Sequence, residues 1–251
     1  MLAVVQVRLA QYNEGMRIEP YTTDSIIHVM KRGARGMDIV GGKTDKWYFI
    51  KSLFLLNDAY SDRNWHRETA GLPLFKRPDH WPERNSLTRI LAWVLMPNHF
   101  HLLLQEKSEG GTAKFMQRLC GSMSLCFNLK YKNNGSIFQG AYKAKVVDDD
   151  SYLRHLLFYI QVKNVLELYP GGLVAALKNF DKAWEWALKY PFSSLPVYVF
   201  GSSSPILGDD QGLISQVHKE ALSKQDAYEM LKLYVDKSDT WSDRIKELIL
   251  E

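Results

Sequence analysis

The sequence predicts an α+β fold, in which a small antiparallel sheet is covered by helices. Short apolar runs with alternating side chains, typical of strands, are separated by longer segments whose apolar residues recur at helical spacing. Two strand-like segments follow each other with only a Pro97-Asn98 step between them, which indicates a hairpin. Hydrophobic residues make up 46% of the 251 residues, which is enough for a substantial core.

The first predicted strand is Ser25 to Met30, a short β-branched run typical of a buried strand. Gly33 and Gly36 follow it and permit a tight turn. The basic side chains of this turn and its backbone amides suit a phosphate, although a solvated loop fits the pattern equally well. These basic residues are Lys31, Arg32 and Arg35.

Next come a helix, from Thr44 to about Asn57, and a long irregular segment, Tyr60 to Ser86. Loops of this length are uncommon in compact domains. Its aromatic residues are interleaved with cations, a pattern that suits the stacking of single-stranded bases. They serve equally as anchors that fix the loop onto the domain, and we favour this interpretation.

The centre of the chain is Leu91 to Gln105, with the sequence LAWVLMPNHFHLLLQ. It predicts a hairpin between a strand from Leu87 to Met96 and a second strand from His99 to Gln105. Because side chains alternate along a strand, His99 and His101 lie on one face. Two imidazoles on a rigid strand form half of a divalent-metal site. In the alternative interpretation, one histidine is a hydrogen-bonded residue at a rim and the other is incidental.

The second half of this region predicts a long helix, Thr112 to Tyr131, and a strand, Ile137 to Val147. The strand carries Lys143 and Lys145 on one face. An acidic cap, residues 148–150, then begins a helix from Tyr152 to Leu168.

A polar stripe is predicted on this last helix, because His155, Tyr159 and Lys163 are four residues apart. The order strand, helix, strand, strand, helix, strand is the ferredoxin-like βαββαβ pattern, with the helix that carries the stripe added at its end. In that arrangement the added helix packs beside the sheet that carries the two histidines.

The chain divides into a lead of residues 1–24, a domain of residues 25–168 and a mostly helical extension of residues 169–251. Ala183 to Leu188, Gln211 to Leu222, Gln225 to Lys237 and Ser242 to Leu250 are predicted to be helical. The sequence of the extension is compatible with three roles: covering a sheet edge, mediating assembly, or binding a partner.

Charge is distributed unevenly around the net value of +4. Residues 1–170 hold 23 Lys and Arg against 16 Asp and Glu, or +7, and the remainder holds 9 against 12, or −3. This asymmetry favours a polyanion partner for the first part. No segment fits a signal peptide or a membrane span, and the two cysteines fit no zinc motif, so we expect reduced thiols and a cytoplasmic protein.

Taken together, these motifs resemble the single-tyrosine HUH transposases, and in particular their REP-associated branch. The resemblance covers roughly residues 25–200. It rests on HVMKRGARGMDIV, LMPNHFHLLL, FMQRL…FNLKYKNNGSIFQGAYKAKVV, DDDSYLRHLLFYIQVKNV and YPFSSL, which occur in the family's order.

The resemblance implies metal-dependent nicking and strand transfer on single-stranded DNA through a 5′-phosphotyrosine intermediate. His99 and His101 would hold Mg²⁺ or Mn²⁺, and Tyr159 would be the nucleophile. Lys31, Arg32, Arg35, Lys143 and Lys145 would bind DNA. The implied partner is single-stranded DNA, in particular hairpin-forming repeats, bound by a monomer or homodimer that is associated with the nucleoid.

One position departs from the family, which usually has Gln or Asn four residues after the tyrosine, where this chain has Lys163. A protonated lysine does not ligate a metal, so Asn164, His155 or an acidic residue would substitute, or Lys163 would contact the scissile phosphate. The same departure favours a second hypothesis, a sequence-specific nucleic-acid-binding regulator that has lost catalysis. A third is a structural metal site in an unrelated ferredoxin-like enzyme.

Overall fold

The computed structural model describes residues 21–209 and 212–236. Its strands are β1 (Ile26–Arg32), β2 (Thr88–Leu95), β3 (His99–Glu106) and β4 (Lys143–Val146). They form one antiparallel sheet in the order β2-β3-β1-β4. The predicted α+β class and the ferredoxin-like order of the strands are both confirmed.

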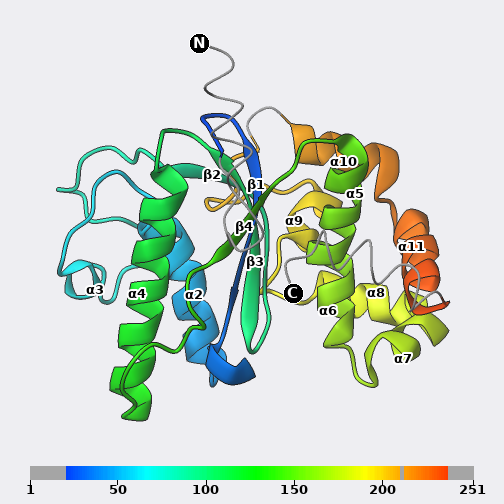
Figure 1. The fold of residues 1–251 in the computed structure, drawn as a ribbon, viewed down its shortest axis with the longest axis horizontal. Coiled ribbons are helices and arrows are strands. Elements are labelled where there is room, and N and C mark those ends of the chain that lie inside the picture. Colours follow the sequence, from blue (N-terminus) through cyan, green and yellow to red (C-terminus); the bar gives the residue numbers. More distant parts are fainter. Residues whose placement is uncertain (1–20, 210–211, 237–251) are drawn as a thin grey trace, which may run out of the picture.

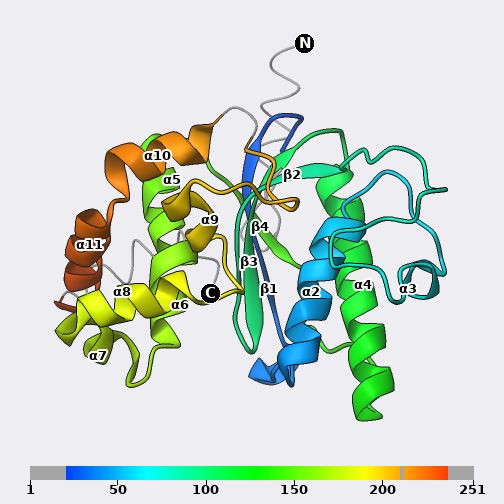
Figure 2. The ribbon, with the colours of Figure 1, turned by 180° about the vertical axis from the view of Figure 1, so that it is seen from behind.

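Helices cover both faces of the sheet (Figure 1). One face carries α2 (Lys43–Leu55) and α4 (Gly111–Tyr131), which join β1 to β2 and β3 to β4. The opposite face carries the segment from α5 to α11 (Figure 2). These helices are α5 (Asp150–Leu157), the π-helix η2 (Phe158–Lys163), α6 (Asn164–Glu167), α7 (Gly172–Lys178), α8 (Phe180–Leu188), α9 (Leu195–Phe200), α10 (Leu213–Ala221) and α11 (Lys224–Asp236). Two short turns complete the described part, η1 (Ala34–Gly36) and α3 (Trp65–Glu68).

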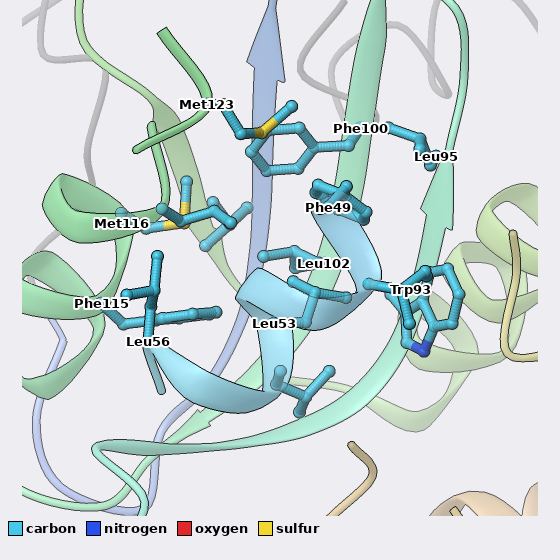
Figure 3. Close-up of a cluster of buried hydrophobic side chains, with 14 of the residues drawn as sticks. Phe49, Leu53, Leu56, Trp93, Leu95, Phe100, Leu102, Phe115, Met116 and Met123 are labelled. Atoms are coloured by element: carbon cyan, nitrogen blue, oxygen red, sulfur yellow. The ribbon is translucent and has the colours of Figure 1, made fainter. Parts of the chain in front are cut away.

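The larger core lies between the sheet and the pair α2 and α4, and Figure 3 shows its centre. Phe100 and Leu102 of β3 meet Phe49 and Leu53 of α2 there, and Phe115 closes the cluster from α4. All five side chains are fully buried. Alternate residues of β3 therefore point away from this core, and His99 and His101 are among them.

A bulge in β2 places two consecutive side chains, Leu91 and Ala92, in the same core. The pairing with β3 shifts between Ile90 and Ala92, which leaves Leu91 as the extra residue. Beyond the bulge, Trp93 packs in the core beside α2, whereas Val94 packs in the second cluster, against the helices of the opposite face.

The extension covers the outer edge of the sheet, which the sequence left open. Backbone hydrogen bonds join Leu95 to Phe192 at 2.9 Å and Ser194 to Trp93 at 2.9 Å. Further along the same strand, the amide of Gly208 donates to the carbonyl of Ile90 at 3.0 Å. An exposed edge strand invites pairing with another chain, so these bonds protect β2 from it.

Residues 137–147 do not form the single predicted strand, because regular pairing begins only at Lys143. Gly140 has a positive φ of 55°, which interrupts extended backbone. Before it, Phe138 bridges Gly33 and the amide of Gln139 donates to Arg32, so the segment follows the turn after β1 through isolated contacts.

The irregular segment after α2 is held by its aromatic residues, as the favoured interpretation predicted. Trp65 and Trp81 are buried against the main core. Arg77 forms an ion pair of 2.7 Å with Asp58, and the guanidinium of Arg84 lies 4.7 Å from the centre of the Phe54 ring. These cations are therefore used to fix the loop.

The remaining helices compare well with the sequence, with a few differences. α10 and α11 lie close to the predicted ranges, and α8 begins three residues earlier. α7 and α9 were not predicted, and the predicted helix at 242–250 lies outside the described residues. No helix in the described ranges has the length and apolar character needed to cross a membrane.

Candidate active site

Two histidines on β3 form the centre of the candidate site. His99 is 7% exposed and His101 is fully buried. Their ring centres are 5.0 Å apart, with the planes at 90°. Both side chains lie on the sheet face that carries the α5-to-α6 segment, as the alternation along the strand predicted.

Each histidine has a hydrogen-bond partner at its Nδ1 atom. For His99, this partner is Oδ1 of Asn98, at 2.7 Å. For His101, it is Nε2 of His28, at 2.9 Å, on the neighbouring strand β1. Burial and the positive charges nearby hold the pKa of His101 well below its usual range, so its ring is neutral at pH 7. A neutral imidazole is the form that binds a metal.

Tyr159 comes to these histidines from the opposite element. It is 3% exposed, and its ring meets that of His101 edge-on with a centre-to-centre distance of 5.4 Å. The helix that carries it was predicted to be a continuous α-helix, but Phe158 to Lys163 is π-helical. Such π segments are frequent at functional sites.

The π segment divides the predicted polar stripe. His155 lies on the α-helix before it, whereas Tyr159 and Lys163 lie within it. His155 is half-buried and its Nδ1 lies 2.6 Å from the carbonyl of Ser151, whereas Tyr159 and Lys163 are buried. Lys163 is therefore buried together with Tyr159 within the π segment.

Lys163 is buried beside the tyrosine ring. Its Nζ atom lies 4.9 Å from the centre of the Tyr159 ring and 5.7 Å from that of Tyr234. It also forms an ion pair of 2.9 Å with Glu167 and a hydrogen bond of 3.4 Å to Asn164. The partner of the buried amine is thus a carboxylate one helical turn away.

The donor atoms present fit a divalent ion in part. Nε2 of His101 is buried and makes no hydrogen bond, although it belongs to a polar ring. An orphaned imidazole nitrogen beside a second histidine fits a metal ligand. Among residues 21–209 and 212–236, no set of three or more His, Cys, Asp and Glu side chains converges on one point. The remaining ligands would have to be other oxygen donors.

A basic cavity of about 350 Å³ lies next to the histidines, on the β1 and β4 side of the sheet. Met30, which lines it, pairs with both His101 and Lys143 across the sheet. Arg32 and Lys143 supply two cationic side chains to the lining, and Gln139 and Ala141 complete it. The cavity therefore adjoins the histidine pair and is suited to an anion.

The other predicted DNA-binding residues lie outside this cavity. Lys31 is 6% exposed and donates a hydrogen bond to the carbonyl of Gly140, with its amine 5.3 Å from the centre of the Phe138 ring. Arg35 is exposed in the turn after β1, with a left-handed φ of 55°. Lys145 lies on β4, with its amine 5.7 Å from the Tyr152 ring.

Three residues at the site were missed by the sequence reasoning: His28, Asn98 and Gln139. His28 stands at the centre of a predicted strand, and a buried histidine in an apolar run was the signal available. Asn98 was noted only as part of a turn. Gln139 belongs to a segment whose predicted strand is not formed.

Comparison with known proteins finds a similarity in the middle of this chain. Residues 83–163 match the family model described as IS200-like transposase. This segment is similar to the IS200-like transposases. The matched segment runs from just before β2 to the end of η2, so it contains both histidines, Tyr159 and Lys163.

Among solved structures, the chain is similar to a REP-associated tyrosine transposase bound to a REP hairpin. The sequence identity is 12% and the TM-score is 0.40, with 78% of this chain and 92% of that chain covered. No curated protein matches the chain.

Proposed function

We propose that this relative of the IS200-like transposases cuts and rejoins single-stranded DNA with Tyr159 as its nucleophile. The observation that carries the proposal is the contact between Tyr159 and His101, which come from different elements and meet in a buried position. A tyrosine that only filled the core would not require a histidine and a lysine against its ring.

The chemistry follows from the residue types. The phenolate oxygen of Tyr159 attacks phosphorus in the DNA backbone, and the bond from phosphorus to the 3′ oxygen breaks. The protein is then linked to the 5′ phosphate, and the 3′ oxygen takes up a proton as it leaves. Because the phosphotyrosine keeps the energy of the broken bond, a second 3′-hydroxyl can attack it and reseal the strand.

His99 and His101 would hold a Mg²⁺ or Mn²⁺ ion through their imidazoles. When bound, such an ion neutralises charge on a nonbridging phosphate oxygen. Lys163 supplies a fixed positive charge beside the tyrosine ring, which favours the phenolate over the neutral phenol.

The basic cavity is the proposed path of the strand that is cut. Arg32 and Lys143 line it, and cations of this kind bind phosphates without reading sequence. Single-stranded DNA near a hairpin-forming repeat is the proposed substrate, with the protein acting at the nucleoid as a monomer or homodimer. Arg35 and Lys145 extend the basic surface beyond the cavity, and Lys31 supports it from behind through Gly140.

A regulator on the same fold is the second candidate, and one observation favours it. Lys163 stands where the related transposases usually have Gln or Asn, and its amine is already ion-paired with Glu167. If Lys163 has replaced a metal ligand and its amine only pairs with Glu167, the protein binds DNA without cutting it.

A covalent-adduct assay tests the proposal. The wild-type protein and Tyr159→Phe are incubated with labelled single-stranded hairpin oligonucleotides, with Mn²⁺ or EDTA, and run on a denaturing gel. We expect a shifted band that requires both Mn²⁺ and Tyr159. Tyr169→Phe is the matched control, because this nearby tyrosine packs on Trp186 and should leave the band unchanged.

Absence of the band across a broad pool of hairpins, together with salt-sensitive binding of the same oligonucleotides, would favour the regulator. Absence of both the band and binding would contradict the two candidates together.

A further inference from the structure

His28 is a buried histidine to which the chemistry proposed above gives no role. It lies at the middle of β1 and is fully buried. Its Nε2 atom is 2.9 Å from Nδ1 of His101, and the two rings stack with centres 5.2 Å apart and planes at 21°.

The sheet fixes this contact. In the antiparallel register of β1 and β3, Met30 pairs with His101 and His28 pairs with Leu103. His28 is therefore the diagonal neighbour of His101 on the same face, within the reach of a ring side chain. Both strands are central in the sheet, so the two imidazoles are held against each other by backbone pairing on both sides.

Two neutral imidazoles that share a hydrogen bond need one proton between the facing nitrogens. Either His101 donates from Nδ1 and His28 accepts, or His28 donates and His101 accepts. In the first case Nε2 of His101 carries a lone pair, and in the second it carries a hydrogen and binds no metal.

We propose that His28 is a positioning residue that accepts a hydrogen bond from Nδ1 of His101 and so holds the lone pair on Nε2 ready for the divalent ion. The inference rests on the proposed function, because it assigns a role in the same metal site. Nε2 of His101 makes no hydrogen bond in the described structure, which is the state that this assignment requires. Metal-bound histidines usually have such a partner on their second nitrogen.

His99, the other predicted ligand, has a similar partner at its Nδ1 atom. Nδ1 of His99 lies 2.7 Å from Oδ1 of Asn98, and an amide oxygen accepts but does not donate. The proton of His99 is then on Nδ1 and its lone pair is on Nε2. Both predicted ligands therefore carry their proton on Nδ1. The amide oxygen of Asn98 accepts it from His99, and the imidazole of His28 accepts it from His101.

Metal affinity tests this role without any DNA chemistry. Mn²⁺ is titrated into the full-length protein and the free ion is measured by electron paramagnetic resonance. We expect His28→Phe, which keeps a ring but offers no acceptor, to bind Mn²⁺ about 10- to 100-fold more weakly than the wild type. His28→Gln, which offers an amide oxygen, should recover part of that affinity.

Ile27→Val is the matched control. Ile27 adjoins His28 but points into the opposite core, so this variant loosens β1 without touching the site. It should keep the wild-type affinity for Mn²⁺. Equal affinity of His28→Phe and the wild type would overturn the proposal, and so would an equal loss in Ile27→Val.

A second measurement reads the tautomer directly in the metal-free protein. Nitrogen-15 shifts of the His101 ring should show the proton on Nδ1 in the wild type. In His28→Phe we expect the proton to redistribute toward Nε2. A wild-type His101 with its proton on Nε2 would contradict the proposal whatever the adduct assay gives.

The two proposals can fail separately. A positive adduct assay with unchanged Mn²⁺ affinity in His28→Phe would retain the nicking chemistry and reject the role of His28. A wild-type protein that binds no Mn²⁺ also rejects it, and an adduct formed in EDTA would then show nicking without the ion.

Discussion

The side-chain amine of Lys163 lies 4.9 Å from the centre of the Tyr159 ring, and both residues belong to the same π-helical segment. The amine does not bind a neighbouring backbone carbonyl but pairs with Glu167 at 2.9 Å. The nucleophile proposed here therefore has a buried cation beside it, and the charge of that cation is balanced by a partly exposed carboxylate.

Lys163→Met should slow formation of the DNA adduct on the order of 10²-fold, because a fixed charge that stabilises the phenolate is removed. DNA affinity should change little, since the amine is buried and lies outside the basic cavity. Single-turnover adduct formation at saturating oligonucleotide measures the rate, and fluorescence anisotropy measures the binding.

The double variant Lys163→Met/Glu167→Gln provides the control for this change. It removes the carboxylate that Lys163→Met leaves unpaired, so it should recover part of the rate. An unchanged rate in Lys163→Met would mean that the lysine serves only to hold the helix.

The basic cavity predicts a particular salt dependence. Arg32→Gln and Lys143→Gln should each weaken binding of single-stranded DNA and reduce the slope of log affinity against log salt by about 1. Lys178→Gln, on the exposed face of α7, is the matched control and should keep the slope. Equal slopes in all four proteins would place the DNA elsewhere.

Lys31→Gln tests whether Lys31 supports the cavity without contacting the DNA itself. Because the Lys31 amine is buried and bonded to Gly140, its loss should lower the free energy of unfolding by about 1–3 kcal/mol. The salt slope should stay that of the wild type. Urea unfolding and the same salt titration measure the two effects, and a reduced slope at wild-type stability would make Lys31 a direct DNA contact.

The sequence predicted the site where the information is local. The alternation of β3 is enough to place His99 and His101 on one face, whatever the strand packs against. The same alternation puts Lys31 on the face of Val29, toward the main core, so its burial was predictable and was missed.

What the sequence could not predict depends on register between distant segments. His28 and His101 are 73 residues apart, and their contact exists only because β1 and β3 pair in one particular alignment. The π-helical turn around Tyr159 has no simple pattern in the sequence. The extension was ambiguous for the same reason, because its bonds to β2 join residues about a hundred positions apart.

The contacts between the extension and β2 should contribute measurably to stability. The hydroxyl of Tyr198 donates to the carbonyl of Leu91, the bulged residue, at 2.5 Å. Tyr198→Phe leaves this carbonyl without the bond, so we expect unfolding to become easier by about 1–3 kcal/mol. Tyr169→Phe, on a tyrosine whose hydroxyl makes no such bond, should change the urea midpoint much less. Equal effects of the two substitutions would show that the bond is unimportant.

Stability should also fall in mild acid because of His218. This residue of α10 is buried, its Nε2 lies 2.6 Å from Oε1 of Gln161, and burial lowers its pKa to about 4. The unfolded chain binds a proton at this histidine below about pH 6.5, whereas the folded chain binds it only near pH 4. Between these values the unfolded state is favoured as pH falls, by up to about 1.4 kcal/mol per pH unit.

The contribution of His218 at pH 5 is therefore about 2 kcal/mol of lost stability relative to pH 7.5. His218→Gln removes the titrating group, so its decline between the two pH values should be smaller by that amount, even if its stability at pH 7.5 is lower. Urea unfolding of both proteins at the two pH values measures the difference. An identical decline in both would mean that the proton is taken up in the folded state as readily as in the unfolded state, and that Gln161 and the α10 helix accommodate a charged ring.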